Sequence, residues 1–252
     1  MICPPDLDDY SPLLNEHIWE RLRGQPPSGA RPRLASSIII VDHSGKQPKV
    51  LMGRRSASDR FMPQKYCFPG GRLDPGDRRM NVAGALAGPV EGRLSRLAPG
   101  SPDLPRALAL AAVRETFEET GLLLGTREHG APPGAPPLWR SFAGQGVYPD
   151  LEPLHLIARA ITPPRLAKRY DTLFFSVDRS ALCGEVPGAV GPDCELVETD
   201  WVTLEDAQQL DVAMITNVVL RELEKRLAAG MPHWMPVPFY RVGPGGWRKE
   251  TL

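Results

Sequence analysis

The chain has few cysteines and no long apolar run. Its four cysteines form no C-x-x-C pair, which argues against a zinc site or a disulfide framework: Cys3, Cys67, Cys183 and Cys194. No apolar stretch approaches the roughly 20 residues that a membrane helix requires, and Met1 to Tyr10 lacks the charged and apolar regions of a signal peptide. The C-terminal Glu250-Thr251-Leu252 is not an S-K-L peroxisomal signal. We therefore expect a soluble, cytoplasmic protein.

A net charge is also lacking, because 30 acidic residues balance 30 basic ones. The chain as a whole therefore has no electrostatic field that attracts nucleic acid or an anionic membrane. Any phosphate binding must depend on charges close to the binding site. We expect a small-molecule partner, no nucleic acid and no membrane. At 252 residues the chain fits one elaborated α/β domain over 34–252, preceded by an extension over 1–33. The oligomeric state stays open, with a homodimer among the alternatives.

Strand and helix patterns alternate along the chain. Leu34 to Val41 and Val50 to Arg54 read as a hairpin around Gly45. Later segments rich in β-branched and aromatic residues are typical of strands: Leu154 to Ile161, Thr172 to Val177 and Leu196 to Val202. Helical patterns cover Asn15 to Arg23 weakly, and more clearly Leu204 to Leu210 and Ala213 to Leu227. The order of these strands and helices along the chain predicts a mixed sheet packed between helices, with an insertion at about 78–102.

One further helix is predicted to run from Pro105 to Thr120, with Asp103 as N-cap and Gly121 as its C-terminal stop. At about 100° per residue, Glu115, Glu118 and Glu119 share one face. Leu110, Val113 and Phe117 fall on the opposite face, so burial of that stripe directs the three carboxylates together.

Clustered carboxylates repel one another, and Arg114 cannot neutralise three of them. Hard divalent cations are the natural partners of such a group. A solvated acidic helix end is the commoner interpretation of E-x-x-E-E alone. The upstream turn Phe68-Pro69-Gly70-Gly71 favours the metal site, because its glycines let backbone amides approach an anion.

These residues resemble the Nudix box, G-x5-E-x7-R-E-U-x-E-E-x-G-U, where U is aliphatic. Fixed positions of the second half are occupied by Arg114, Glu115, Glu118, Glu119, Gly121 and Leu122. Thr116 replaces an aliphatic residue, and Asp77, separated from Gly71 by five residues, stands in place of glutamate. The box is also split, because 36 residues, 78 to 113, stand where the pattern has seven.

Flanking motifs resemble the coenzyme A diphosphatase subgroup, the peroxisomal enzyme of animals and its bacterial relatives, which also carry a split box. They are Met52 to Ser56, Phe61-Met62-Pro63, Arg169 to Thr172 with Phe174-Phe175, and Glu195 leading to Trp201-Val202. The resemblance covers about residues 34–228. It implies an α/β/α sandwich with a mixed central sheet, Mg2+ or Mn2+ as cofactor, and hydrolysis of a nucleoside diphosphate derivative.

The substrate class by resemblance is coenzyme A or acyl-coenzyme A. ADP-ribose, NADH or another nucleoside diphosphate derivative is the alternative, and a catalytically silent nucleotide-binding module is a second one. The resemblance assigns catalysis to Glu115, Glu118 and Arg114, and metal binding to Glu115, Glu118, Glu119 and the carbonyl of Gly71. Additional metal or base roles fall to Asp77 and Glu195, and substrate binding to Arg55, Gly70 and Arg72.

Because side chains alternate between the two faces of a strand, only one residue of each neighbouring charged pair can face the site. Glu195 and Glu198 cannot face the same way along a strand, and neither can Arg54 and Arg55. We favour Glu195 and Arg55 as the members that face the site. Three aromatic residues allow either adenine stacking or core packing, with core packing preferred: Trp139, Phe142 and Tyr148. No Ser-His-Asp or Cys-His arrangement supports nucleophilic catalysis.

Overall fold

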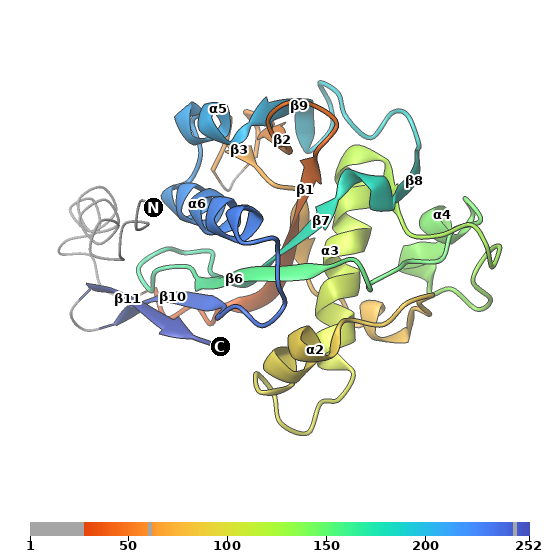
Figure 1. Cartoon of the computed structure of the whole chain (residues 1–252), viewed down its shortest axis with the longest axis horizontal. Coiled ribbons are helices and arrows are strands. Elements are labelled where there is room, and N and C mark those ends of the chain that lie inside the picture. The colour runs from red at the N-terminus through yellow and green to blue at the C-terminus, as the bar shows by residue number, and fades with distance from the viewer. Residues whose placement is uncertain (1–27, 60–61, 244–245) are drawn as a thin grey trace.

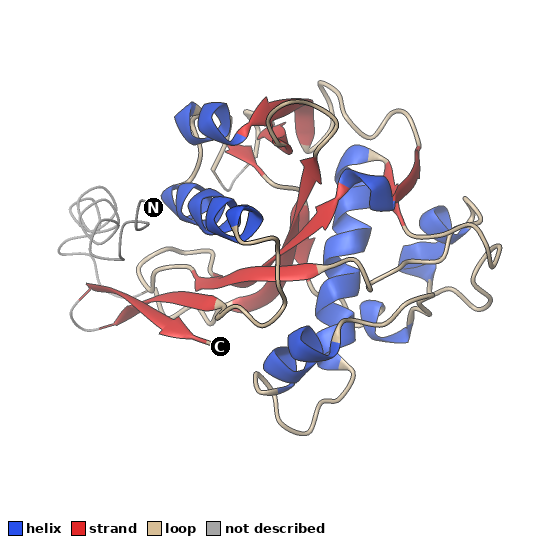
Figure 2. Cartoon of the chain, viewed as in Figure 1, coloured by secondary structure: helices blue, strands red, loops and turns tan. Residues whose placement is uncertain are grey.

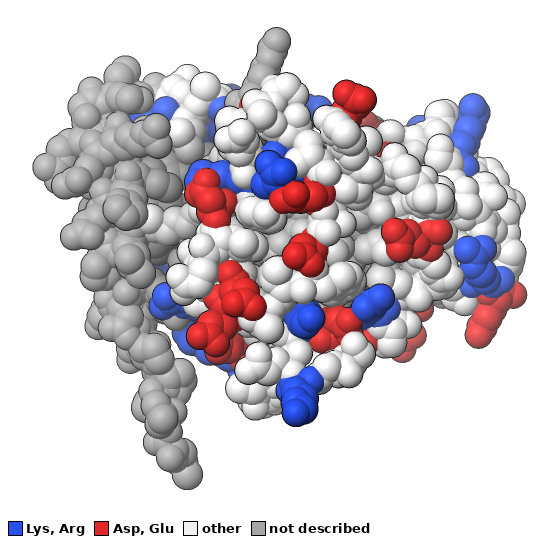
Figure 3. Space-filling view, turned by 90° about the horizontal axis from the view of Figure 1, so that it is seen from above, with Lys and Arg blue, Asp and Glu red and all other residues white. Residues whose placement is uncertain are grey.

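The computed structural model describes residues 28–59, 62–243 and 246–252. The helix predicted over Asn15 to Arg23, Phe61, and most of the N-terminal extension lie outside the described residues. Within the described ranges, no helix has the length and apolar character needed to cross a bilayer. Acidic and basic side chains are interspersed on the face shown in Figure 3, as the balanced composition leads one to expect.

A mixed nine-stranded sheet forms the centre of the molecule (Figures 1 and 2). Its middle strand β1 (Arg33–Asp42) pairs in parallel with β7 (Tyr170–Asp178) and antiparallel with β2 (Lys49–Arg55) and β4 (Gly70–Arg72). The strand order is β11-β10-β6-β7-β1-β2-β3, and β9 also pairs with β2. The remaining strands are β3 (Tyr66–Cys67), β6 (His155–Ile161), β9 (Leu196–Thr203), β10 (Pro238–Gly243) and β11 (Gly246–Thr251).

Alternating residues of β1 send apolar side chains into two separate cores. Ile38 and Ile40 belong to the core shared with the long helix α3 (Leu104–Thr120). Ile39 and Val41 belong to the core shared with α6 (Met214–Ala228). Because both faces of the strand are buried, β1 reads as a continuous apolar run. The helices lie on opposite faces of the sheet (Figure 1), which confirms the predicted α/β fold with a mixed sheet.

The segment predicted as an insertion folds against the same core as α3. It contains the 3-10 turn η2 (Asp77–Arg79) and helix α2 (Gly88–Ser95). Met80, Val90 and Leu94 are fully or almost fully buried in that core. The segment is therefore built into the helical layer beside α3, as Figure 1 shows.

Several elements escaped the sequence analysis because their patterns are short or interrupted. The C-terminal hairpin β10–β11 begins at Pro238, and β10 extends the sheet beside β6. A separate two-stranded sheet joins β5 (Leu122–Leu124) to β8 (Leu182–Glu185). Three short helical pieces were also missed: η3 (Pro137–Trp139), α4 (Arg140–Ala143) and η4 (Arg179–Ala181). The short helix α5 (Leu204–Gln209), in contrast, lies where the sequence predicted one.

Candidate active site

Helix α3 presents the acidic segment Glu115 to Glu119 at its C-terminal end. It ends at Gly121, whose φ of 76° is the left-handed conformation that glycine adopts without strain. Asp103 occupies the N-cap position, but its side chain makes no cap hydrogen bond. The expected side-chain cap is therefore wrong: Asp103 accepts from Arg78 Nη1 at 2.7 Å and from Ser101 Oγ. The ion pair with Arg78 competes for the oxygens that a cap would use.

The three helical carboxylates do not share one environment. Glu115 and Glu119, one turn apart, line the same pocket, whereas Glu118 does not line it. The Glu119 side chain is buried and its Oε2 accepts from the Gly70 amide at 3.0 Å. The Glu118 side chain is 40 % exposed. Leu110 and Val113 are buried as predicted, but Phe117 on the same stripe is only half-buried and packs edge-on against Phe142.

Arg114 connects the two halves of the split motif. Its Nη1 donates to Glu115 Oε1 and to Glu118 Oε2, both at 2.9 Å. Its Nε donates to Asp77 Oδ1 at 2.9 Å, and Nη2 donates to Asp77 Oδ2 and to the Arg72 carbonyl. One guanidinium thus holds three carboxylates from two segments that are 37 residues apart.

Asp77 is enclosed beneath this cluster and does not face the pocket. Its side chain is fully buried, and Oδ1 also accepts from Trp139 Nε1 at 3.0 Å. Oδ2 accepts from the Asp74 amide as well as from Arg114. Both carboxylate oxygens of Asp77 thus accept hydrogen bonds from groups inside the protein. This geometry corrects the prediction that Asp77 is an additional metal ligand or base. Its contacts are those of a group that positions Arg114.

The Gly70-Gly71 turn brings backbone against the carboxylates. A Cβ at Gly71 would lie 2.3 Å from Glu115 Cδ, so only glycine leaves space for that carboxylate. A Cβ at Gly70 would lie 2.5 Å from the Ser36 carbonyl oxygen, and the φ of 155° adds to the constraint. The double glycine therefore permits contact between β4 and the acidic end of α3.

A second arginine brings Glu195 to the same pocket. Arg55 Nη2 donates to Glu195 Oε1 at 2.6 Å and also pairs with Asp59. Glu198 lies outside the pocket, where it accepts from Arg54 Nε at 2.6 Å and from Tyr66. The bulge in β2 between Arg54 and Arg55 separates the two pairs.

Burial raises the pKa of each helical carboxyl. The largest effect is on Glu119, where burial and then the nearby Glu195 carboxylate raise the pKa well above its ordinary value. Burial also raises the pKa of Glu115 and Glu118, opposed by Arg114. The Cys67 thiol lies in this environment, and burial followed by Glu119 raises its pKa to about 12. Excess negative charge is thus concentrated in a region of low dielectric.

No group of three His, Cys, Asp or Glu residues within the described ranges is arranged to hold a metal ion. The side chains concerned point instead to protein donors: Glu115 to Arg114, Glu195 to Arg55, and Glu119 to the Gly70 amide. The donor types of these side chains nevertheless suit a hard divalent cation, since all are carboxylate oxygens. A cation would compensate the charge that burial disfavours at Glu119.

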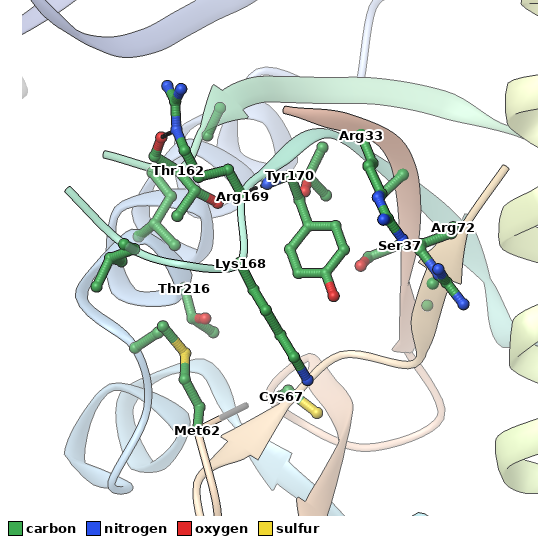
Figure 4. A pocket seen from close by; sticks show the side chains of 18 of the residues that line it. Arg33, Ser37, Met62, Cys67, Arg72, Thr162, Lys168, Arg169, Tyr170 and Thr216 are labelled. Carbon is green, nitrogen blue, oxygen red and sulfur yellow. Dashed lines mark hydrogen bonds between the residues drawn. The ribbon is translucent and has the colours of Figure 1, made fainter. Parts of the chain in front are cut away.

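The pocket has a volume of about 900 Å³. Its floor is one face of the sheet, formed by alternate residues of β1, β4 and β7: Arg33, Ala35, Ser37, Gly70, Arg72, Tyr170, Thr172 and Phe174. The first turn of α6 and the loop before β7 contribute further walls, including Thr216 and Lys168 (Figure 4). The acids Glu115, Glu119 and Glu195 lie in the same pocket.

Sequence reasoning missed several residues of this pocket. Lys168 extends from the loop before β7 with its amino group directed toward Cys67 (Figure 4). Arg33 and Tyr170 are neighbours across the β1–β7 register. Alternation along β1 places Arg33 on the face of Ser37, a signal that the sequence already contains. Neither Trp139 nor Phe142 lines the pocket, because both are in the core, and Tyr148 packs against His129.

Comparison with known proteins agrees with this geometry. No family model matches the chain. The human acyl-coenzyme A diphosphatase NUDT19 is 29 % identical over 258 aligned positions, covering 75 % of this chain and 67 % of that protein. The crystal structure of a Nudix hydrolase from Alicyclobacillus acidocaldarius is 28 % identical with a TM-score of 0.55, covering 77 % of this chain and 91 % of that one.

The chain resembles the Nudix hydrolases in both sequence and fold. It resembles the coenzyme A diphosphatase subgroup within that family, as the flanking motifs predicted. The resemblance supports an enzyme that acts on the diphosphate bond of a nucleoside diphosphate derivative. The split motif and the Asp77 substitution are therefore compatible with family membership, since Arg114 joins the two halves in space.

Proposed function

We propose that this Nudix hydrolase cleaves the diphosphate linkage of coenzyme A or acyl-coenzyme A, with Mg2+ or Mn2+ as cofactor. The observation that carries the proposal is one pocket in which Glu115, Glu119 and Glu195 meet the double-glycine turn and unpaired basic side chains. The likeness to a human acyl-coenzyme A diphosphatase supports the substrate class. The size of the pocket supports a nucleotide with a further moiety attached.

Glu119, Glu115 and the Gly71 carbonyl are the proposed metal ligands, with Glu118 as an outer carboxylate joined to Glu115 through Arg114. When bound, the divalent cation neutralises charge on the diphosphate oxygens and lowers the pKa of water. Glu115 and Glu195 must turn from their arginines to take part. Arg55, released from Glu195, is then placed to donate to a phosphate oxygen.

The chain's own groups supply orientation and proton transfer. Hydrolysis breaks one bond between phosphorus and the bridging oxygen, while the oxygen of water adds to that phosphorus. Glu195 is the proposed acceptor of the water proton, because it lies beside Glu119 and is half exposed to the pocket. Arg114, fixed by Asp77, orients Glu115 and Glu118. Tyr170 on the floor is the proposed stacking partner of the adenine base.

A substrate panel tests this function. Purified protein is incubated with coenzyme A, ADP-ribose, NADH and a dinucleoside polyphosphate, with Mg2+, with Mn2+ and with excess chelator. We expect metal-dependent cleavage, fastest with coenzyme A or its acyl derivatives, and none with chelator. Product masses identify the broken bond. Cleavage of ADP-ribose or NADH in preference to coenzyme A contradicts the substrate assignment, and cleavage of none contradicts the diphosphatase itself.

A further inference from the structure

The cationic side chains that line the active-site pocket fall into two groups. Three are engaged by protein groups: Arg55 by Asp59 and Glu195, Lys65 by Asp211, and Arg169 by the carbonyls of Ala30 and Thr162. The others make no hydrogen bond or ion pair with any residue that the structure describes: Arg31, Arg33, Arg72 and Lys168. The pocket therefore presents positively charged side chains that form no ion pair with a described carboxylate.

Arg33 and Arg72 occupy neighbouring places on the pocket floor. In the antiparallel register Ala35 lies opposite Arg72, so Arg33, two residues before Ala35, is the diagonal neighbour of Arg72. Diagonal neighbours in such a pair are about 7 to 8 Å apart, which long side chains span easily. Both side chains point to the same side of the pocket in Figure 4, and both are exposed. One anion can therefore contact both guanidinium groups.

This pair is separate from the carboxylate cluster that the diphosphate requires. The acids Glu115, Glu119 and Glu195 would hold the divalent cation, which would neutralise charge on the diphosphate. Arg33 also lies directly opposite Tyr170 in the parallel register of β1 and β7. Tyr170 offers an aromatic face for a base, and the arginines then lie beside the sugar that the base carries.

We propose that Arg33 and Arg72 form a subsite for a phosphomonoester on the sugar of the substrate's nucleotide. The inference rests on the proposed diphosphatase function and sharpens its substrate class to nucleotides with one phosphate besides the diphosphate. A phosphomonoester carries close to two negative charges at pH 7 and three acceptor oxygens. Two fork-shaped guanidinium groups match that charge and geometry. A nucleoside diphosphate derivative without the phosphomonoester leaves both arginines unpaired.

The test compares coenzyme A with 3′-dephospho-coenzyme A, which differ only in that phosphomonoester. We expect wild-type kcat/KM to favour coenzyme A by about tenfold or more. Arg33→Gln and Arg72→Gln should each reduce this preference by about tenfold, mainly through KM. Arg96→Gln is the matched control, because Arg96 is exposed and lies outside the pocket, and it should keep the wild-type preference. Equal wild-type kcat/KM for the two substrates, or variants with unchanged preference, overturns the subsite.

A binding measurement separates failure of the subsite from failure of the proposed function. Calorimetry with adenosine 3′,5′-bisphosphate and with adenosine 5′-monophosphate requires no hydrolysis. The bisphosphate should bind at least about tenfold more tightly to the wild type, and the Arg33→Gln/Arg72→Gln double variant should lose that difference. If neither coenzyme A form is cleaved but the difference is present, the diphosphatase proposal fails and the subsite stands. Equal affinities in the wild type overturn the subsite whatever the enzyme cleaves.

Discussion

At the scale of single residues, the site depends on how buried charges are paired. Asp77 and Arg114 illustrate this best, since both side chains are almost entirely buried and share two hydrogen bonds. The sequence identified both positions but assigned Asp77 a place at the metal. Only the structure reveals that its carboxylate is enclosed by Trp139 and the Asp74 amide.

Asp77→Asn should therefore destabilise the protein more than it alters substrate affinity. The substitution keeps the shape but leaves the buried Arg114 charge without its main partner, at a cost of about 3 kcal/mol. Urea unfolding of the wild type and the variant measures the difference. Asp103→Asn is the matched control, because the Asp103–Arg78 pair is partly exposed and contributes less than about 1 kcal/mol. Equal small losses for the two variants would show that the Asp77 pair has no special structural role.

At the scale of elements, helix α3 and the β1–β4 pairing position the site. Periodicity was sufficient to predict α3, the β1–β2 hairpin, β6, β7, β9, α5 and α6. It did not identify β10 and β11, where prolines and glycines interrupt the pattern, or the two-residue strand β3. The helical wheel placed three carboxylates on one face, but tertiary contacts separate Glu118 from Glu119. Arg114 donates to Glu118, and the Gly70 amide donates to Glu119.

The end of α3 should be sensitive to any side chain at Gly121. A Cβ there would lie 2.0 Å from the Val186 carbonyl oxygen, and the positive φ adds the cost of a left-handed conformation. Gly121→Ala should lower the free energy of unfolding by about 2 kcal/mol or more and displace the nearby acidic turn. Gly92→Ala in α2 is the control, since its Cβ meets no atom within 4 Å and alanine favours a helix. Thermal unfolding of both variants checks this; a stable Gly121→Ala protein would contradict it.

At the scale of the whole molecule, residues from distant parts of the sequence form one pocket between β1, α3 and the loop before β7. Composition and motifs predicted the fold class and most of the acidic residues. They did not identify Arg33 or Lys168, because an exposed basic residue in a sequence carries no sign of what it faces. The comparisons show a similarity to Nudix hydrolases, and the geometry adds a basic region that the Nudix box does not include.

The central claim is that the pocket around Glu119 is the metal-dependent diphosphatase site, and one rate comparison tests it most directly. Cleavage of coenzyme A at saturating Mg2+ is measured for the wild type, Glu119→Gln and Glu198→Gln. Glu198 is the matched control, because it pairs with Arg54 outside the pocket. The account predicts a loss of kcat of at least about a hundredfold for Glu119→Gln and less than about threefold for Glu198→Gln. Wild-type turnover by a folded Glu119→Gln protein would contradict it.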